Sequence, residues 1–297
     1  MTVVRDTPAR SSDVPGLAAG LVTVTAWGSA FVAIRAAADD LSPGALALGR
    51  LLVACLVLTA IALVRREALP ASRDLLALAV FGILWMGVYS ITLNAAEHRV
   101  DAGTAAMLIN TGPILIAVLA GAFLHEGFPP RLFAGCAVAF IGAVLIGIGS
   151  ARSEGSSVLG VALCLVAASA YAVAVVVQKP VLARVSSLQV TWLGCVAATI
   201  ACLPFAPSLA SETAEVGASA VGWVIYLGLV PTALGFVTWA FALNRTSAGR
   251  MAALAYLIPV VAVVLGWVVL DEVPARLAIA GGALCLGGVY VARRRPS

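Results

Sequence analysis

Long apolar stretches, separated by short polar connections, run along nearly the whole chain. Each stretch is about 20 residues long, the length that an α-helix needs to cross a hydrocarbon core about 30 Å thick. The pattern predicts an all-α integral membrane protein with ten transmembrane helices, over residues 16–36, 42–64, 74–95, 101–124, 132–150, 157–178, 187–206, 219–243, 249–270 and 275–292. The short connections hold nearly all of the charge and leave no room for a soluble domain.

Composition supports the membrane interpretation. The chain is 62% hydrophobic and 11% charged, with a mean hydropathy of +1.07, whereas an ordinary soluble domain is about 45–50% apolar and about 25% charged. Residues 1–15 are polar and are expected to form a cytoplasmic tail. The apolar run that follows is too long for a signal-peptide core, so we expect no cleavage there.

The distribution of basic residues predicts the topology. If the N-terminus lies inside, most of the 18 Lys and Arg residues fall in cytoplasmic connections, as the positive-inside rule requires. Both termini are then cytoplasmic, and residues 293–297 form a basic tail. Seventeen arginines against one lysine, with abundant Ala, Gly and Val, are typical of a GC-rich bacterial genome. We therefore expect a multi-pass protein of a bacterial inner membrane.

The chain contains an internal repeat. Residues 99–145 align without a gap on residues 245–291 at a constant offset of 146. Matched pairs include Gly103 with Gly249, Pro113 with Pro259, Glu126 with Glu272, Gly135 with Gly281 and Gly142 with Gly288. The alignment predicts two five-helix repeats, over residues 16–150 and 157–292. Because five is odd, the second repeat is inverted, an arrangement that many secondary transporters use for alternating access.

The same residues resemble a known family. The stretch Trp27-Gly28-Ser29-Ala30-Phe31-Val32-Ala33-Ile34-Arg35, the intramembrane Arg50, and the helix ends Leu124-His125-Glu126 and Leu270-Asp271-Glu272 are similar to the EamA family of the drug/metabolite transporter (DMT) superfamily. The resemblance implies a central cavity lined mainly by helices 1, 3, 4, 6, 8 and 9. One departure is Ala167-Ala168 in helix 6, where helix 1 has Trp27-Gly28, so the two cavity walls need not be equivalent.

Two prolines at matching repeat positions are the first candidate substrate-binding residues. Pro113 and Pro259 lie near the middle of their helices, and each frees a backbone carbonyl four residues earlier. Paired interruptions at the midplane are a pointer to a transporter's binding site, and packing kinks are the alternative. Asn110 and Tyr256, three residues before the prolines, project at the same depth and join the candidate site.

Further candidates come from helices 1 and 6. Trp27, Ser29, Ser169 and Tyr171 lie near mid-membrane, where an interfacial aromatic belt does not place them. They bind substrate or pack in the core. Tyr89 and Trp239 lie nearer the two surfaces and are typical of interfacial anchors.

Arg50 is the one charge well inside a predicted span. An intramembrane charge is a functional hypothesis by default, although an arginine can also extend toward the interface or bind helix-end carbonyls. We favour a gating or structural role over direct substrate binding.

Other functions lack the residues that they require. The fourteen acidic residues lie in loops or near helix ends, and the only histidines are His98 and His125. The sequence therefore predicts no catalytic site, metal or cofactor, and its scattered basic residues predict no nucleic-acid partner. The expected partners are a small-molecule substrate and the lipid bilayer, with a homodimer as a further candidate. The glycine faces on helices 5 and 10 are expected to form close scaffold contacts, either within a protomer or between protomers.

We expect a carrier, an exporter or facilitator, of small neutral or zwitterionic metabolites, with amino acids as one candidate class. A proton-coupled multidrug or cation exporter and a non-transporting membrane partner subunit are the alternatives. The lack of a mid-membrane carboxylate argues against the proton-coupled exporter, and the inverted repeat argues against the partner subunit.

Overall fold

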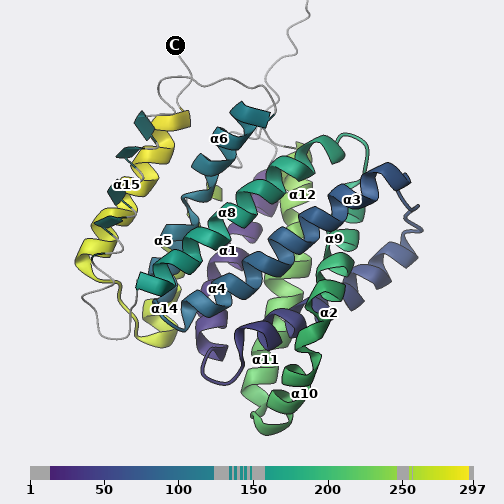
Figure 1. The fold of residues 1–297 in the computed structure, drawn as a ribbon, viewed down its shortest axis with the longest axis horizontal. Helices are drawn as coiled ribbons and strands as arrows, with labels where there is room; N and C mark the ends of the chain where they lie inside the picture. The colour runs from purple at the N-terminus through teal and green to yellow at the C-terminus, as the bar shows by residue number, and fades with distance from the viewer. Residues whose placement is uncertain are drawn as a thin grey trace, which may run out of the picture.

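A computed structural model describes residues 14–123, 158–245, 254–255 and 257–293, together with scattered positions between 134 and 148. Every regular element in these ranges is helical (Figure 1). Six of its helices are long and apolar enough to cross a membrane: Val14–Ala37 (α1), Pro43–Val64 (α2), Ser72–Glu97 (α3, η1 and α4), Val158–Val181 (α8), Ser187–Glu215 (α9, η2 and α10) and Ala218–Trp239 (α11, η3 and the start of α12). Large apolar side chains such as Leu56, Leu76 and Val268 point outward from them and their neighbours, which suits a lipid surround.

The remaining helices are shorter, and one predicted span is divided. Residues 101–124 form α5 (Ala102–Ile109) and α6 (Gly112–Phe123), separated at Asn110 and Thr111. The chain ends with α14 (Ile258–Leu270) and α15 (Arg276–Arg293).

Both prolines of the repeat lie at helix starts. Pro113 is the second residue of α6, and Pro259 is the second residue of α14. Proline is tolerated in a first helical turn because its missing amide would have no intrahelical partner there. The interruption expected at each proline is therefore present in the backbone.

One predicted connection is wrong. Residues 207–218 were expected to form a loop, but α9 (Ser187–Cys202) continues through the 3-10 turn η2 (Leu203–Phe205) into α10 (Ala206–Glu215). Pro207 occupies the first turn of α10, and the Ala, Leu and Glu residues that follow it favour a helix. Low hydropathy marked this segment as outside the membrane without indicating its helical structure.

Two π-helical segments occupy equivalent positions. η1 (Gly82–Val88) joins α3 (Ser72–Phe81) to α4 (Tyr89–Glu97), and η3 (Gly228–Leu234) joins α11 (Ala218–Leu227) to α12 (Gly235–Arg245). They begin 146 residues apart, the offset of the sequence repeat. Such π segments are rare and often lie at functional sites.

The glycine that starts each π segment permits a close helix contact. A Cβ on Gly82 would overlap the backbone of Gly194 in α9. A Cβ on Gly228 would lie 2.5 Å from Cβ of Val53 and 2.8 Å from the carbonyl oxygen of Arg50, both in α2. Only glycine fits either contact without movement of the neighbouring helix.

Helix starts also recur. Ser42 and Ser186, 144 residues apart, precede α2 and α9 in the same extended conformation, with ψ of 151° in both. Backbone features of the first half thus return in the second half at two closely similar offsets.

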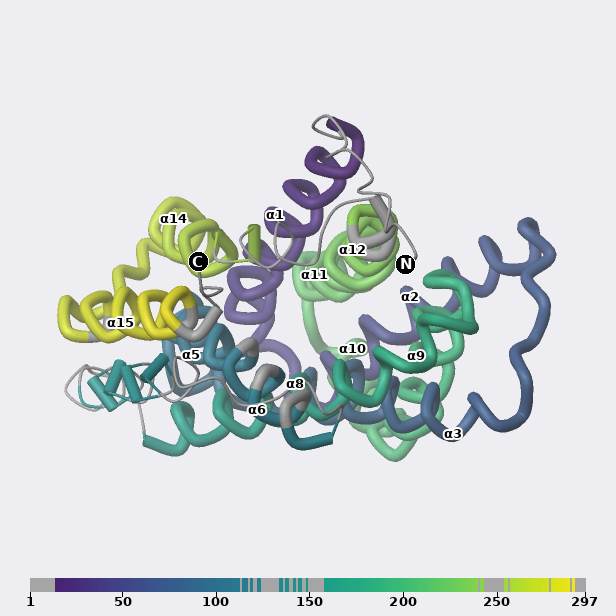
Figure 2. Tube along the Cα trace, turned by 90° about the horizontal axis from the view of Figure 1, so that it is seen from above, coloured from purple at the N-terminus to yellow at the C-terminus, as the bar shows by residue number. Residues whose placement is uncertain are grey.

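Contacts between the two halves hold the fold together. α1 packs between α12 and α14, and α8 packs against α4 and α6 (Figures 1 and 2). α15 lies at one side of the molecule (Figure 2), where a Cβ on Gly142 would lie 2.5 Å from the carbonyl oxygen of Gly281. The glycine face expected on helices 5 and 10 therefore makes a contact within one protomer.

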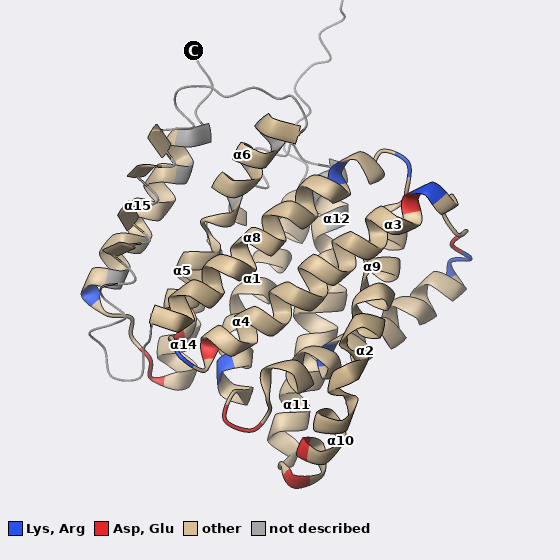
Figure 3. Ribbon diagram, in the orientation of Figure 1, with Lys and Arg blue, Asp and Glu red and all other residues tan. Residues whose placement is uncertain are grey.

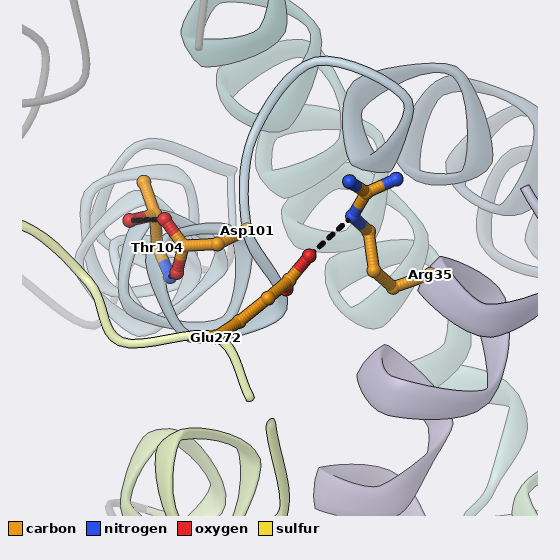
Figure 4. Close-up of polar contacts among 4 residues, drawn as sticks. All are labelled: Arg35, Asp101, Thr104 and Glu272. Carbon is orange, nitrogen blue, oxygen red and sulfur yellow. Dashed lines mark hydrogen bonds and ion pairs between the residues drawn. The ribbon is translucent and has the colours of Figure 1, made fainter. Parts of the chain in front are cut away.

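Charged side chains lie mainly at the two ends of the bundle (Figure 3). At one end Arg184 Nη2 lies 2.6 Å from Asp74 Oδ1. At the other end Arg35 Nε, in the last turn of α1, lies 2.8 Å from Glu272 Oε1, which follows α14 (Figure 4). Each ion pair joins segments from opposite halves of the chain.

Candidate functional site

A cavity lies between the two halves of the bundle, enclosing about 780 Å³ including its mouth. Its walls come from α1, α2, η1, α4, α5, α8, η3, α12 and α14 and from the positions just before α6 and α14. The described lining residues are Trp27, Ala30, Phe31, Ile34, Arg50, Trp85, Tyr89, Leu93, Ala106, Ile109, Asn110, Tyr171, Pro231, Phe236, Trp239, Ala255 and Ile258.

Aromatic rings form much of the wall. The ring of Trp27 lies 5.1 Å from that of Trp239 and 5.4 Å from that of Phe236, centroid to centroid. The ring of Trp85 lies 4.8 Å from that of Tyr171. Contacts at these distances stabilise aromatic clusters, and their faces can hold an apolar group or a cation.

A π segment positions the ring of Trp27. Trp27 Nε1 donates a 3.0 Å hydrogen bond to the carbonyl oxygen of Pro231 in η3. This bond ties the centre of α1 to the opposite half of the chain. A buried indole N–H usually finds such a partner.

Arg50 brings a positive charge to the cavity. Its side chain comes from α2 and is 7% exposed. Both Nε and Nη2 donate to the hydroxyl oxygen of Thr232 in η3, at 3.1 and 2.9 Å. Thr232 in turn donates to the carbonyl oxygen of Leu227 at 2.8 Å. Among the described residues that line the cavity, Arg50 alone carries a formal charge.

Asn110 adds an amide to the same cavity. It follows the last residue of α5, and its side chain is 6% exposed. Ile109 and Ala255, which precede the two prolines by four residues, also line the cavity. An amide group is thus present beside an otherwise apolar wall.

Four of the candidate residues from the sequence are brought together here: Trp27, Asn110, Tyr171 and Arg50. Arg50, for which the sequence favoured a gating or structural role over substrate binding, lines the cavity directly. Tyr89 and Trp239 also line it, although their depth was typical of interfacial anchors.

The other candidates lie elsewhere. Ser29 bonds with the hydroxyl of Tyr226 at 2.7 Å and donates to the carbonyl of Ala26. Ser169 is exposed on α8 and donates to the carbonyl of Leu165. Neither serine is among the lining residues.

The remaining candidates are the two prolines and Tyr256. Pro259 is buried within α14. Pro113 lies in α6, and Tyr256 falls outside the described residues.

Sequence reasoning missed Trp85 and Phe236. Both lie in the middle of apolar segments, where an aromatic residue is also expected in an ordinary core. Whether they line the cavity depends on which face of each helix points toward it. The π turns of η1, which contains Trp85, and of η3, which precedes Phe236, change that orientation.

A polar cluster lies near one end of the cavity wall, next to Ile34 and Leu93. The Arg35–Glu272 ion pair lies beside the start of α5, where Asp101 accepts hydrogen bonds from the backbone N–H and hydroxyl of Thr104 (Figure 4). Glu97, the last residue of α4, is fully buried nearby. Neither of its carboxyl oxygens has a hydrogen-bond partner in the described part of the chain.

Comparison with known proteins identifies the same architecture. The sequence profile of the EamA-like transporter family matches residues 14–148 and again residues 158–294. A probable terminal-alkyne amino-acid exporter of Streptantibioticus cattleyicolor is 38% identical, over 93% of this chain and 92% of the relative. A probable amino-acid metabolite efflux pump of Salmonella typhimurium is 27% identical, over 91% of this chain and 92% of the relative.

A solved crystal structure shares the fold. It is 21% identical to this chain, covers 94% of it and 96% of its own length, and superposes with a TM-score of 0.61. Together with the six long apolar helices, these matches show a multi-pass membrane protein.

Proposed function

The chain belongs to the EamA-like transporter family, and we propose that it exports small zwitterionic metabolites, amino acids among them, by alternating access around the aromatic cavity. The observation that carries this proposal is the place of Arg50, a buried guanidinium in a wall rich in aromatic rings, whose other described lining residues carry no charge.

The cavity chemistry suits a molecule with a carboxylate and an apolar body. A guanidinium binds a carboxylate through charge-assisted hydrogen bonds, and Arg50 Nη1 makes no hydrogen bond to another described residue. The rings of Trp27, Trp85 and Tyr171 offer faces to an apolar side chain or to an ammonium group. A multiply charged anion such as a sugar phosphate would need more cations than the described wall provides.

Alternating access follows from the inverted repeat. The recurring π segments, helix starts and glycine contacts support two structurally equivalent halves of five helices each, ten spans in total. The first helix of each half packs against the other half. Rocking of the two halves against each other would therefore open the cavity to one side of the membrane while closing it to the other. Transporters built from inverted repeats work in this way, with substrate at the repeat interface.

The topology belongs to the same proposal. Arg65, Arg66, Arg73, Lys179 and Arg184 lie at the end where α2 finishes and α3 begins. By the positive-inside rule this end is cytoplasmic, which puts both termini in the cytoplasm of a bacterial inner membrane. The Arg35–Glu272 pair then lies at the outer end. A homodimer stays a prediction.

Counterflow in proteoliposomes tests the function. Purified protein is reconstituted with a high internal concentration of one unlabelled amino acid, and entry of the same labelled amino acid is followed across a panel with apolar, aromatic, acidic and basic side chains. We expect saturable counterflow of apolar zwitterions. Saturable movement of purines, sugars or quaternary amines, without any amino acid, would contradict the proposed substrate class.

A further inference from the structure

Glu97 is a buried carboxyl group that the proposed transport cycle does not use. It ends α4 with a fully buried side chain and two oxygens without a hydrogen-bond partner among the described residues. An ionised carboxylate is very costly to bury without a partner, and such a group is instead held in its neutral, protonated form. In the arrangement described here, Glu97 therefore carries a proton.

The groups around Glu97 offer no stable replacement for that proton. The titratable and charged groups that act on it or adjoin it are Glu272, Arg35, Asp101, Arg50, His98, Arg99, Tyr89 and Cys164. Arg35 is paired with Glu272, and Arg50 is bonded to Thr232. No group of three or more Asp, Glu, His or Cys residues suited to a metal occurs in the described ranges. The cation that fits this place is a proton.

Glu97 lies one helical turn beyond the cavity wall. Leu93, one turn before Glu97, lines the cavity, and so does Ile34, next to Arg35. The Arg35–Glu272 pair lies at the same end, with side chains 29% and 24% exposed. Both carboxyl oxygens of Glu97 lack a hydrogen-bond partner among the described residues, as does Glu272 Oε2, and burying an unpaired carboxylate is costly. The protonation state of Glu97 therefore bears on how this end packs.

We propose that Glu97 is a proton-binding site that controls the outer end of the cavity. A proton from the outer solution binds the carboxylate and allows the end to close under the Arg35–Glu272 pair. Loss of the proton to the same solution leaves a charged carboxylate, which is stabilised by hydration or by an ion pair with Arg35. The outer end of the cavity then opens. This inference rests on the proposed alternating-access function.

Labelling of a cavity cysteine from outside tests the proposal without a substrate. Ala30→Cys places a thiol in the cavity wall, and a membrane-impermeant maleimide is added to intact cells from about pH 5.5 to about pH 8.5. The rate is divided by that of an Asp40→Cys variant, whose exposed thiol at the same end reports the reagent's own pH dependence. The parent protein gives the background from the native cysteines.

We expect the normalised rate to rise several-fold with external pH. In Glu97→Gln, whose amide imitates the protonated acid, the rate should stay low at every pH. Glu215→Gln, the same change at an exposed carboxyl of this end, should leave the profile unchanged. Burial, with Arg99 and Arg35 nearby, lowers the pKa of His98 from its usual value of 6.5. His98 is therefore neutral above that pH, and the labelling rate of His98→Gln should still increase with pH there.

Two outcomes would overturn the inference. A pH-dependent profile that persists in Glu97→Gln would assign the effect to another group. A normalised labelling rate of Ala30→Cys that does not change with pH would show that no proton controls this end. That measurement uses native Glu97, so it tests the inference even if Glu97→Gln fails to fold. Absence of labelling at every pH would instead contradict alternating access itself, and the inference with it.

Discussion

Arg50 and Thr232 are joined by a forked contact in which Nε and Nη2 of the guanidinium donate to one hydroxyl oxygen, at 3.1 and 2.9 Å. Arg50 belongs to α2 and Thr232 to the π segment η3, so the contact crosses between the two halves of the chain. The Thr232 oxygen accepts both bonds through its two lone pairs, while its own proton is donated to the carbonyl oxygen of Leu227. The hydroxyl therefore orients the one charged group among the described cavity residues.

Loss of that hydroxyl should misplace the guanidinium. Thr232→Val keeps the side-chain volume but removes the acceptor, which leaves two buried donors of Arg50 unpaired at a cost of about 1–3 kcal/mol. We expect the apparent KM for a transported amino acid to rise about tenfold, measured by counterflow in proteoliposomes. Thr92→Val, which loses only hydrogen bonds to carbonyls of its own helix, should leave KM unchanged; equal effects of the two variants would contradict this role.

Arg50→Lys separates charge from geometry. Lysine keeps the positive charge but loses the planar array of donors that grips a carboxylate. We expect transport to fall about 10- to 100-fold, since hydrogen bonds to charged groups are worth about 1.5–3 kcal/mol. The exposed Arg276→Lys serves as control. Full activity of Arg50→Lys would leave Arg50 with a purely structural role.

Trp27→Phe removes the hydrogen bond to Pro231 while keeping an aromatic ring. A typical loss of about 1 kcal/mol predicts a KM raised about fivefold. The comparison is Trp223→Phe, whose ring contacts Tyr226 and is not among the described lining residues. If Trp223→Phe raised KM as much as Trp27→Phe, the cavity position of Trp27 would not explain the effect.

Gly82→Ala should destabilise the protein. The added Cβ would overlap the backbone of Gly194, which cannot move without shifting α9, and overpacking of this kind costs about 1–3 kcal/mol. We expect a lower melting temperature in detergent. Gly222→Ala is the matched control, because nothing lies within 4 Å of its added Cβ. An unchanged melting temperature of Gly82→Ala would show that the contact between η1 and α9 is loose.

Hydropathy alone located the long helices, because a span must be apolar whatever it packs against. Pro113 and Pro259 located the interruptions, because a missing amide acts locally. The continuation of α9 into α10 was missed because helicity outside the membrane leaves no hydropathy signal. The sequence did place Glu97 near a helix end, but its burial depends on the packing of α4 against α8, α2 and α1.

The cavity residues divide along similar lines. Trp27, Asn110 and Tyr171 could be selected because aromatic or amide groups at mid-membrane are unusual. The direction in which Trp85 and Phe236 face depends on η1 and the region around η3, and nothing in Gly82–Val88 distinguishes a π turn from an α turn. Ser169-Ala170-Tyr171 resembles Ser29-Ala30-Phe31 in sequence, yet α8 turns Ser169 outward.

The repeat leaves the cavity symmetric in its backbone and one-sided in its chemistry. At the offsets of the repeat, Thr232 corresponds to Met86 and Arg50 corresponds to Gly194. Only one wall therefore presents a guanidinium and its hydroxyl, while the equivalent place opposite is filled by a thioether and bare backbone. An amphiphilic cargo should keep the same orientation throughout transit, its head fixed against one half while the barrier moves from one side of it to the other.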